Sequence, residues 1–272
     1  MLSLNFNTNT LKDDGLIKIK NFLDKSQLEK VSAIISKHRY KKGSDDSYFA
    51  INYRTLIYKL LKLNIDSFKE NLLIFNLYKS LKLKYFSDKY FGKNTRLNMI
   101  DGYYNSTLDN KDKPVIPWHT DQAYSGSDLK LIKNFVNPED YTLKFFIYLT
   151  DVYKNNGCMS YIPGSHKITY LIRKGIYEGK LDYSPYWSSD QIVDFISLKK
   201  NKSYILENLE QKTILDEFIS NIEKIKNNNH EFDYSLKAGD AIIFNEGLVH
   251  KGSKLLHSDR MILRFHFKPI IN

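Results

Sequence analysis

The sequence predicts a mainly β fold with buttressing helices, a jelly roll or barrel, formed by a single domain over residues 1–272. Residues 1–92 have mainly helical patterns and would support the core. Residues 93–166 and 235–268 hold short β-branched or aromatic runs separated by turn residues, which would form the core itself. Residues 167–234 interrupt these runs with a polar and partly helical insertion. A parallel α/β sheet would instead alternate strands and helices along the whole chain.

The first ninety residues predict one short strand followed by two helical stretches. Apolar and polar residues alternate over residues 15–23, as in a strand with one buried face. A helix capped by Asp24 or Ser26 is expected to run to about residue 39. Residues 66–90 are rich in Leu, Phe and Tyr and form the second helical stretch.

The strands of the core are expected after Gly92, where Gly, Asn, Asp and Pro separate short apolar runs. They cover residues 96–104, 115–124, 143–152, 158–162, 241–245, 248–253 and 260–268. Within the insertion, a Tyr-rich loop at residues 170–187 is expected to act as a lid, because long loops in compact domains tend to be functional. A helix is expected near residues 211–226.

Composition excludes several classes of protein. The net charge is +10, and its surplus lies in residues 1–100, with 19 Lys and Arg against 9 Asp and Glu. The lysines are scattered and form no block interleaved with aromatics, which argues against a nucleic-acid partner, while the surplus mildly favours an anionic small-molecule substrate. No apolar run is long enough to cross a bilayer, so no membrane partner is expected. The single cysteine, Cys158, rules out an internal disulfide and predicts a cytoplasmic location.

Three residues suggest a metal centre. His119 and Asp121 lie two positions apart in a predicted strand, so their side chains point to the same face. By itself this triplet is common and more often marks two surface residues. His250 lies in a later predicted strand, after the turn at Gly239 and Asp240. Two imidazoles and one carboxylate form the facial triad of non-haem Fe(II) oxygenases, which leaves positions open for a co-substrate and O2.

Two arginines could complete such a site. Arg260, Arg264 and His266 share one face of the predicted strand 260–268. A guanidinium facing the metal cavity could bind a dicarboxylate through a bidentate, charge-assisted pair. The competing interpretation is that these cations face solvent on an edge strand and discourage pairing with another sheet.

Taken in order, these motifs resemble the phytanoyl-CoA dioxygenase family of Fe(II)/2-oxoglutarate-dependent oxygenases. The similar segments are residues 14–23, 118–122, 156–166, 239–240 and 250–253, followed by Arg260. The Ile-Pro-Gly-Ser-His run at residues 162–166 is the one that is specific by itself. Many members follow the second iron-binding histidine directly with Gly-Ser, whereas Lys251 intervenes here and puts a role for Ser253 in doubt.

The resemblance implies a double-stranded β-helix, the cupin-like jelly roll. It implies that His119, Asp121 and His250 bind Fe(II), and that Arg260 receives the distal carboxylate of 2-oxoglutarate, with Arg264 as the alternative. The implied activity is that of a dioxygenase that consumes O2, hydroxylates a small molecule and releases succinate and CO2. Because halogenating relatives replace the carboxylate ligand with a small residue, Asp121 argues against halogenation.

Two other classes stay open at this point. The chain could be a non-catalytic jelly-roll binding protein that keeps ancestral ligands, or a cupin-like metal enzyme that does not use 2-oxoglutarate. Among the remaining polar residues, His166 is expected to brace a loop and His266 to line the cavity. Lys144 lies inside an apolar strand, where it would either touch an anionic substrate or co-substrate or extend to solvent from an edge. Cys158 is expected to be a small buried hydrophobe.

Overall fold

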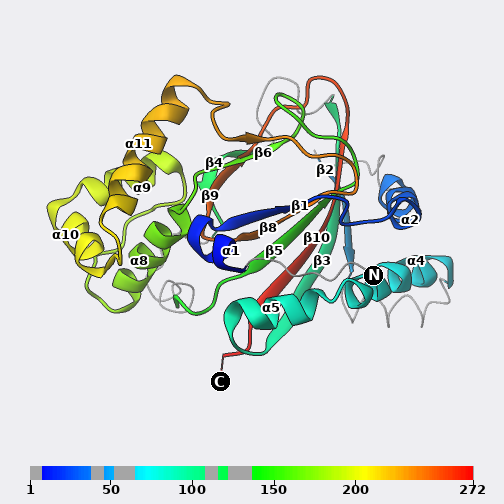
Figure 1. The fold of residues 1–272 in the computed structure, drawn as a ribbon, viewed down its shortest axis with the longest axis horizontal. Coiled ribbons are helices and arrows are strands. Elements are labelled where there is room, and N and C mark those ends of the chain that lie inside the picture. Colours follow the sequence, from blue (N-terminus) through cyan, green and yellow to red (C-terminus); the bar gives the residue numbers. More distant parts are fainter. Residues whose placement is uncertain (1–7, 38–45, 52–64, 108–115, 122–136, 272) are drawn as a thin grey trace.

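The chain forms two antiparallel β-sheets with helices on the outside (Figure 1). The computed structural model describes residues 8–37, 46–51, 65–107, 116–121 and 137–271. The six-stranded sheet has the order β1-β8-β5-β10-β3-β2 and the four-stranded sheet the order β4-β9-β6-β7. These sheets and their helices confirm the predicted mainly β architecture.

The strand bounds agree with most of the predicted runs. The six-stranded sheet contains β1 (Leu16–Ile19), β2 (Asp46–Ile51), β3 (Thr95–Asn105), β5 (Leu143–Tyr148), β8 (Ala241–Asn245) and β10 (Arg260–Pro269). The four-stranded sheet contains β4 (Ile116–Thr120), β6 (Met159–Tyr161), β7 (Asp233–Tyr234) and β9 (Val249–Gly252). Strand β2 was not anticipated. Residues 115 and 122–124 of one predicted strand lie outside the described residues.

Strands β5 and β10 lie in the middle of the larger sheet. β5 pairs with β8 on one side and β10 on the other, and β10 also pairs with β3. The interpretation of Lys144 and the two arginines as solvent-facing cations of edge strands is therefore wrong. Their charged side chains are instead carried by strands with a neighbour on each side, which places them inside the fold.

Helices cover the outer face of the six-stranded sheet (Figure 1). They are α2 (Lys25–Ser36), α4 (Ile65–Ser80) and α5 (Leu83–Phe91), preceded by the short α1 (Thr8–Asp14). Of the two predicted caps, Asp24 and not Ser26 caps α2, in a capping box with Gln27. The predicted helical stretch 66–90 is divided, because Lys82 has a positive φ of 52° between α4 and α5. The predicted end of α2 at residues 38–39 lies outside the described residues.

The alternation of side chains along β5 and β10 separates two cores. Phe145 and Phe265 face the helices and pack against Val31, Ile74 and Phe86 in one large cluster. The side chains on the opposite face point into the space between the two sheets, as the period of two requires. On β5 these are Lys144, Phe146 and Tyr148, and on β10 they are Arg260, Ile262, Arg264 and His266. This inner face carries the polar residues of the site.

The insertion is a helical subdomain with its own apolar core. It contains α8 (Ser165–Tyr177), α9 (Ser189–Ser197), α10 (Lys199–Asn208) and α11 (Thr213–Asn227). The helix predicted near 211–226 is confirmed as α11. The loop predicted at 170–187 is partly wrong, since residues 170–177 belong to α8, where Ile168, Leu171 and Ile172 bury one helical face.

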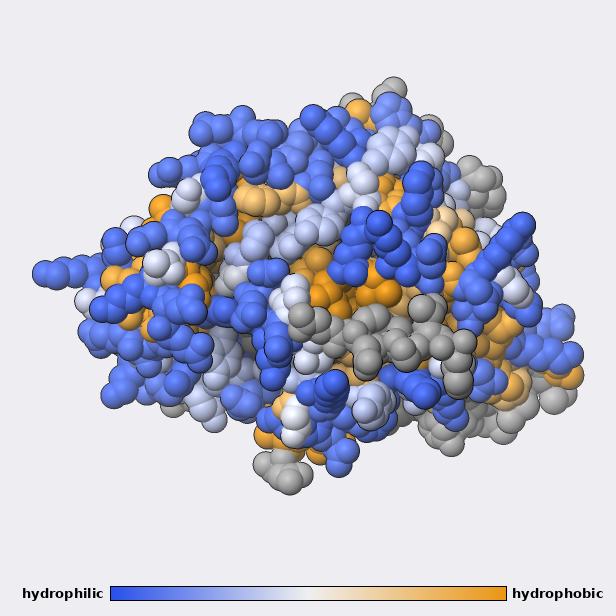
Figure 2. Space-filling model, in the orientation of Figure 1, coloured by the Kyte–Doolittle hydropathy of each residue, from blue (hydrophilic) through white to orange (hydrophobic). Residues whose placement is uncertain are grey.

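Charged and polar side chains dominate the face of the molecule shown in Figure 2. Hydrophilic residues cover most of the face shown in Figure 2, and apolar residues show between them near its centre. Among the described residues, none of the helices combines the length and the apolar character that crossing a membrane requires.

Candidate metal centre

Strand pairing brings the two histidines of the predicted triad together. β4 and β9 are antiparallel neighbours, and His119 is paired directly with His250. Their ring centroids lie 4.4 Å apart, and both residues are buried. Asp121 follows the end of β4, and its backbone N–H donates to the carbonyl of Glu246 in the turn before β9. Two segments far apart in the sequence thus present three side chains to one point.

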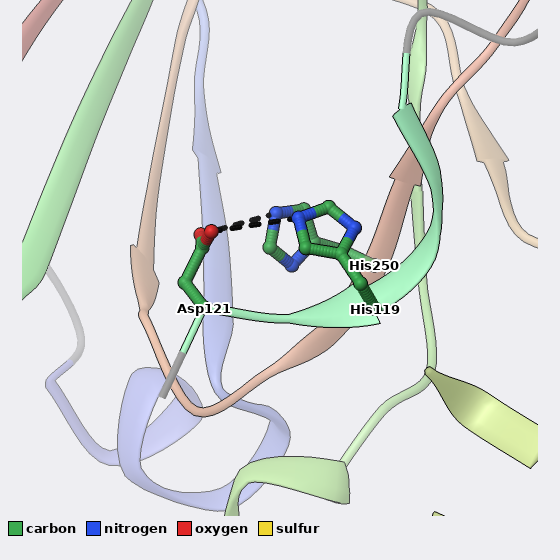
Figure 3. Close-up of side chains that lie close together, drawn as sticks. All are labelled: His119, Asp121 and His250. Carbon is green, nitrogen blue, oxygen red and sulfur yellow. Dashed lines mark ion pairs between the residues drawn. The ribbon is translucent and has the colours of Figure 1, made fainter. Parts of the chain in front are cut away.

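The ring orientations suit a metal ion. The Nδ1 atom of His119 lies 2.7 Å from the carbonyl of Pro117, and Nδ1 of His250 lies 2.9 Å from the carbonyl of Leu248. A carbonyl only accepts, so each Nδ1 carries the proton and each Nε2 keeps its lone pair. Both Nε2 atoms lie 3.4 Å from an oxygen of Asp121 (Figure 3). The three ligand atoms lie within 4.8 Å of one another, close enough to share one ion.

The electrostatics keep Asp121 and His250 in their metal-binding forms. Burial by itself would raise the pKa of the Asp121 carboxyl, but the Lys144 ammonium and the two imidazoles hold this pKa well below its usual range. Burial lowers the pKa of His250 to about 4. At neutral pH the site therefore offers one carboxylate and a neutral His250 imidazole, which fits a ferrous ion with open positions.

Lys144 contacts the triad directly. Its Nζ donates to Oδ2 of Asp121 at 2.6 Å. Neither sequence-based interpretation of this lysine anticipated a bond to a candidate metal ligand. The only signal available was a cation at an inward-facing position of an otherwise apolar strand.

A pocket of about 160 Å³ connects the triad with the predicted co-substrate arginine. Its lining comes from both sheets and includes His119, Asp121 and His250 together with Arg260. A larger cavity of about 580 Å³, between α1, α8 and α10, contains none of these four residues. Volume therefore does not locate the site, whereas the convergence of polar groups does.

Arg260 donates hydrogen bonds to the side chain of Asn105 and to the backbone of Gly157. Its Nε and Nη2 donate to Oδ1 of Asn105 at 2.9 and 2.7 Å, and its Nη1 donates to the carbonyl of Gly157 at 3.0 Å. Asn105 lies directly opposite Arg260 in the β3–β10 register. These bonds orient the guanidinium at the edge of the pocket.

Arg264 has a different environment. It forms a bidentate pair with Asp101, with Nε to Oδ1 at 2.6 Å and Nη2 to Oδ2 at 2.7 Å. The Asp101 side chain is 0% exposed, and the guanidinium lies over the ring of Tyr103 at 4.2 Å. Arg264 also lines the pocket, but its guanidinium forms its bidentate pair with Asp101, a buried carboxylate of the protein itself.

The other polar candidates have structural surroundings. His166 Nε2 contacts the carbonyl of Lys12, so this histidine braces the last turn of helix α1 and not a loop. His266 faces the space between the sheets, but it is not among the lining residues of the 160 Å³ pocket. Ser253 lies outside that lining and contacts Cys158, which is fully buried as predicted.

Two aromatic contributions were missed by the sequence analysis. The Trp187 ring packs on His119 with centroids 5.2 Å apart, and the Trp187 carbonyl accepts from the backbone N–H of Thr120. Tyr148 lines the pocket from β5. Its inward direction follows from alternation along the strand, but the insertion segment that carries Trp187 has no sequence signal for docking beside β4.

Comparisons with known proteins agree with this site. The family model for phytanoyl-CoA dioxygenase (PhyH) matches residues 11–260. A search of curated proteins found no match.

Solved structures match over nearly the whole chain. The carbocyclase SnoK from nogalamycin biosynthesis, described as non-heme and alpha ketoglutarate dependent, has 16% identity and a TM-score of 0.54, covering 98% of this chain and 84% of its own. HygX from Streptomyces hygroscopicus, solved with nickel and 2-oxoglutarate, has 14% identity and a TM-score of 0.56, covering 100% and 89%. The epimerase SnoN, in complex with Fe3+, alpha ketoglutarate and nogalamycin RO, has 14% identity and a TM-score of 0.55, covering 96% and 82%.

At these identities the solved structures show a shared fold, whereas the family match extends along most of the sequence. Together with two imidazoles and a carboxylate converging between the sheets, that match identifies the chain as a member of the phytanoyl-CoA dioxygenase (PhyH) family of Fe(II)/2-oxoglutarate-dependent oxygenases.

Proposed function

We propose that the protein is an Fe(II)- and 2-oxoglutarate-dependent dioxygenase that hydroxylates a small-molecule substrate, with release of succinate and CO2. The observation that carries the proposal is the single pocket lined by His119, Asp121, His250 and Arg260. In this proposal the two sheets form a double-stranded β-helix in which residues 93–166 and 235–268 make the core. Residues 1–92 support it, and the helical insertion at 167–234 covers one end.

The proposed metal ligands are His119, Asp121 and His250. Neutral imidazole nitrogens and a carboxylate match the preference of ferrous iron, and three protein ligands leave positions for a co-substrate. The backbone carbonyls of Pro117 and Leu248 fix the tautomer and direction of both rings before a metal arrives. Bound iron would supply the activation of O2 with 2-oxoglutarate as the source of electrons.

Arg260 is the proposed partner of the distal carboxylate of 2-oxoglutarate. Its observed hydrogen bonds end on the amide oxygen of Asn105 and a backbone carbonyl, both neutral, whereas Arg264 is matched to the carboxylate of Asp101. A carboxylate that enters the pocket could accept charge-assisted hydrogen bonds from the Arg260 guanidinium. The pocket volume of about 160 Å³ suits a five-carbon dicarboxylate.

The chain's own residues would position the substrate and keep water away from the metal. Trp187, which packs on His119 and is 36% exposed, is suited to form a wall of the entrance. A small anionic substrate is favoured by the basic character of the first hundred residues. The lone buried thiol of Cys158 is consistent with the reducing conditions of the cytoplasm.

An anaerobic titration tests this function. The metal-free protein and a His119→Ala variant would be titrated with Fe(II) and then with 2-oxoglutarate, followed by admission of O2 and assays of succinate and CO2. We expect the wild type to bind both ligands, to develop a visible charge-transfer band, and to form succinate. His119→Ala should lose Fe(II) binding and succinate formation together.

Two outcomes would favour the classes left open by the sequence, and a third measurement tests hydroxylation itself. Wild-type protein that binds no metal would favour a non-catalytic binding protein. Metal binding without 2-oxoglutarate binding would favour a cupin-like metal enzyme of another type. Since solved neighbours are named as a carbocyclase and an epimerase, product analysis must show incorporation of oxygen from O2 for hydroxylation to stand.

A further inference from the structure

Lys144 is a buried cation in the middle of the six-stranded sheet. Its neighbours Leu143, Phe145 and Ile147 pack in the helix-side core, so the Lys144 side chain points between the sheets. The residue is 8% exposed. An ammonium in such surroundings is costly unless it is paired, which makes its partner informative.

That partner is one particular oxygen of the proposed carboxylate ligand. Lys144 Nζ lies 2.6 Å from Oδ2 of Asp121, the oxygen that also lies 3.4 Å from Nε2 of His250. The other oxygen, Oδ1, lies 3.4 Å from Nε2 of His119. The two oxygens of Asp121 are therefore inequivalent, because one of them already accepts from an ammonium.

The position of Lys144 also argues against a direct role in binding the co-substrate. It is not among the residues that line the 160 Å³ pocket, whereas Asp121 is. The ammonium therefore contacts Asp121 without lining the pocket itself. From there it can act on the metal through Asp121 and through its charge.

Two physical consequences follow for a cation that enters the triad. The bond to Lys144 fixes the direction of the carboxylate and occupies one oxygen, which opposes coordination through both oxygens. The fixed positive charge a few ångströms away repels a dication, so the site binds metal less tightly than the same three ligands would without the lysine.

We propose that Lys144 is a positioning residue of the metal centre, which holds Asp121 as a ligand through one oxygen and lowers the affinity of the triad for divalent cations. This inference rests on the metal centre proposed above.

The test measures metal binding without turnover. Metal-free wild type and the variants Lys144→Met, Lys144→Gln and Lys144→Arg would be titrated calorimetrically with Co(II) in the absence of 2-oxoglutarate, and their visible Co(II) absorption spectra recorded. Met keeps the length of the side chain without charge or donor, Gln keeps a donor, and Arg keeps both. Lys268→Met is the matched control. Lys268 lies on the neighbouring strand β10, and its ammonium forms an ion pair with Asp140 at 3.0 Å.

We expect Lys144→Met and Lys144→Gln to bind Co(II) at least about tenfold more tightly than wild type, the scale that Coulomb repulsion across a few ångströms of protein gives. Lys144→Arg should stay within about threefold of wild type, and so should Lys268→Met. The Co(II) spectrum should change in Lys144→Met and keep its wild-type form in Lys144→Arg. The rise in Tm on saturation with Co(II) should be larger for Lys144→Met than for wild type.

Equal or weaker Co(II) binding by Lys144→Met and Lys144→Gln would overturn the inference, as would an equal gain in Lys268→Met. If Lys144→Met does not fold, Lys144→Gln and Lys144→Arg decide the question by the same comparison. Absence of Co(II) binding by the wild type would instead refute the proposed metal centre, so the two failures are distinguishable.

Discussion

Replacing Arg264 should lower the stability of the protein, whereas replacing Arg260 should weaken co-substrate binding. Arg264 holds both oxygens of Asp101 at 2.6 and 2.7 Å, and the Asp101 side chain is completely buried. Arg264→Met would leave this carboxylate without its cation. We expect the free energy of unfolding to fall by roughly 3–5 kcal/mol, the cost of breaking a buried pair by removal of one partner.

A double variant separates the cost of an orphaned charge from the cost of lost packing. Asp101→Leu combined with Arg264→Met replaces the pair by two apolar side chains on adjacent strands, which lie opposite each other in the β3–β10 register. Such replacements are often close to neutral, so the double variant should recover most of the stability lost in Arg264→Met. Urea denaturation of the metal-free proteins at pH 7 measures all three values.

Arg260→Ala provides the functional contrast. We expect its affinity for 2-oxoglutarate in the metal-loaded protein to fall at least about tenfold, the loss of a charge-assisted bond, with Co(II) affinity little changed. Isothermal titration calorimetry gives both constants. If Arg264→Met is as stable as wild type and loses 2-oxoglutarate while Arg260→Ala retains it, the assignment of the two arginines is reversed.

Three further predictions concern Gly157, His166 and Cys158. Gly157 has a φ of +73°, and a Cβ there would lie 2.8 Å from Cδ of Arg260. Gly157→Ala should therefore weaken 2-oxoglutarate binding in calorimetry. The control Gly179→Ala, at a φ of +69° with open space around it, should leave that binding unchanged. Burial lowers the pKa of His166 to about 4, below its unfolded value of about 6.5, so the unfolded chain binds the extra proton and stability is lost as pH falls from about 6.5 to 4. His166→Gln should therefore reduce the difference in unfolding free energy between pH 7 and pH 4.5 by about 2–3 kcal/mol. An unchanged difference would contradict this. Burial raises the pKa of the Cys158 thiol to about 11. A disulfide reagent at pH 8 should therefore modify this thiol at least about a hundredfold more slowly in the native protein than in urea. Rapid labelling of the native protein would contradict this, because it would show that the thiol is accessible.

The local pattern of the sequence was sufficient for the strands that matter most. Leu143–Tyr148 is a run rich in aromatic and β-branched residues. Along Arg260–Pro269 most polar and apolar residues alternate, and this alternation assigned Arg260, Arg264 and His266 to one face. The same reasoning failed at residues 170–177, where tyrosines suggested a loop. The apolar positions of α8 bury against the insertion's own core, and this contact overrides the polar composition.

The candidate metal site could be predicted because its residue types are chemically specific ligands, although no single motif was specific. His119 and Asp121 share a face by strand geometry, and the ordered set of motifs supplied His250. The interpretation of cations on edge strands failed because an edge is a property of the assembled sheet. A sequence does not show which strands lie beside β5 and β10.

The sequence by itself determined the chemistry that is available: two imidazoles, a carboxylate and inward-facing arginines on short strands of a mainly β fold. The tertiary structure decided which of these groups meet. Pairing of β4 with β9 placed His119 opposite His250, while the register of β3 against β10 gave Asp101 to Arg264 and Asn105 to Arg260. The same packing directed Lys144 onto Asp121. These partnerships depend on contacts between residues distant in the chain, and such contacts leave no periodic trace in local sequence.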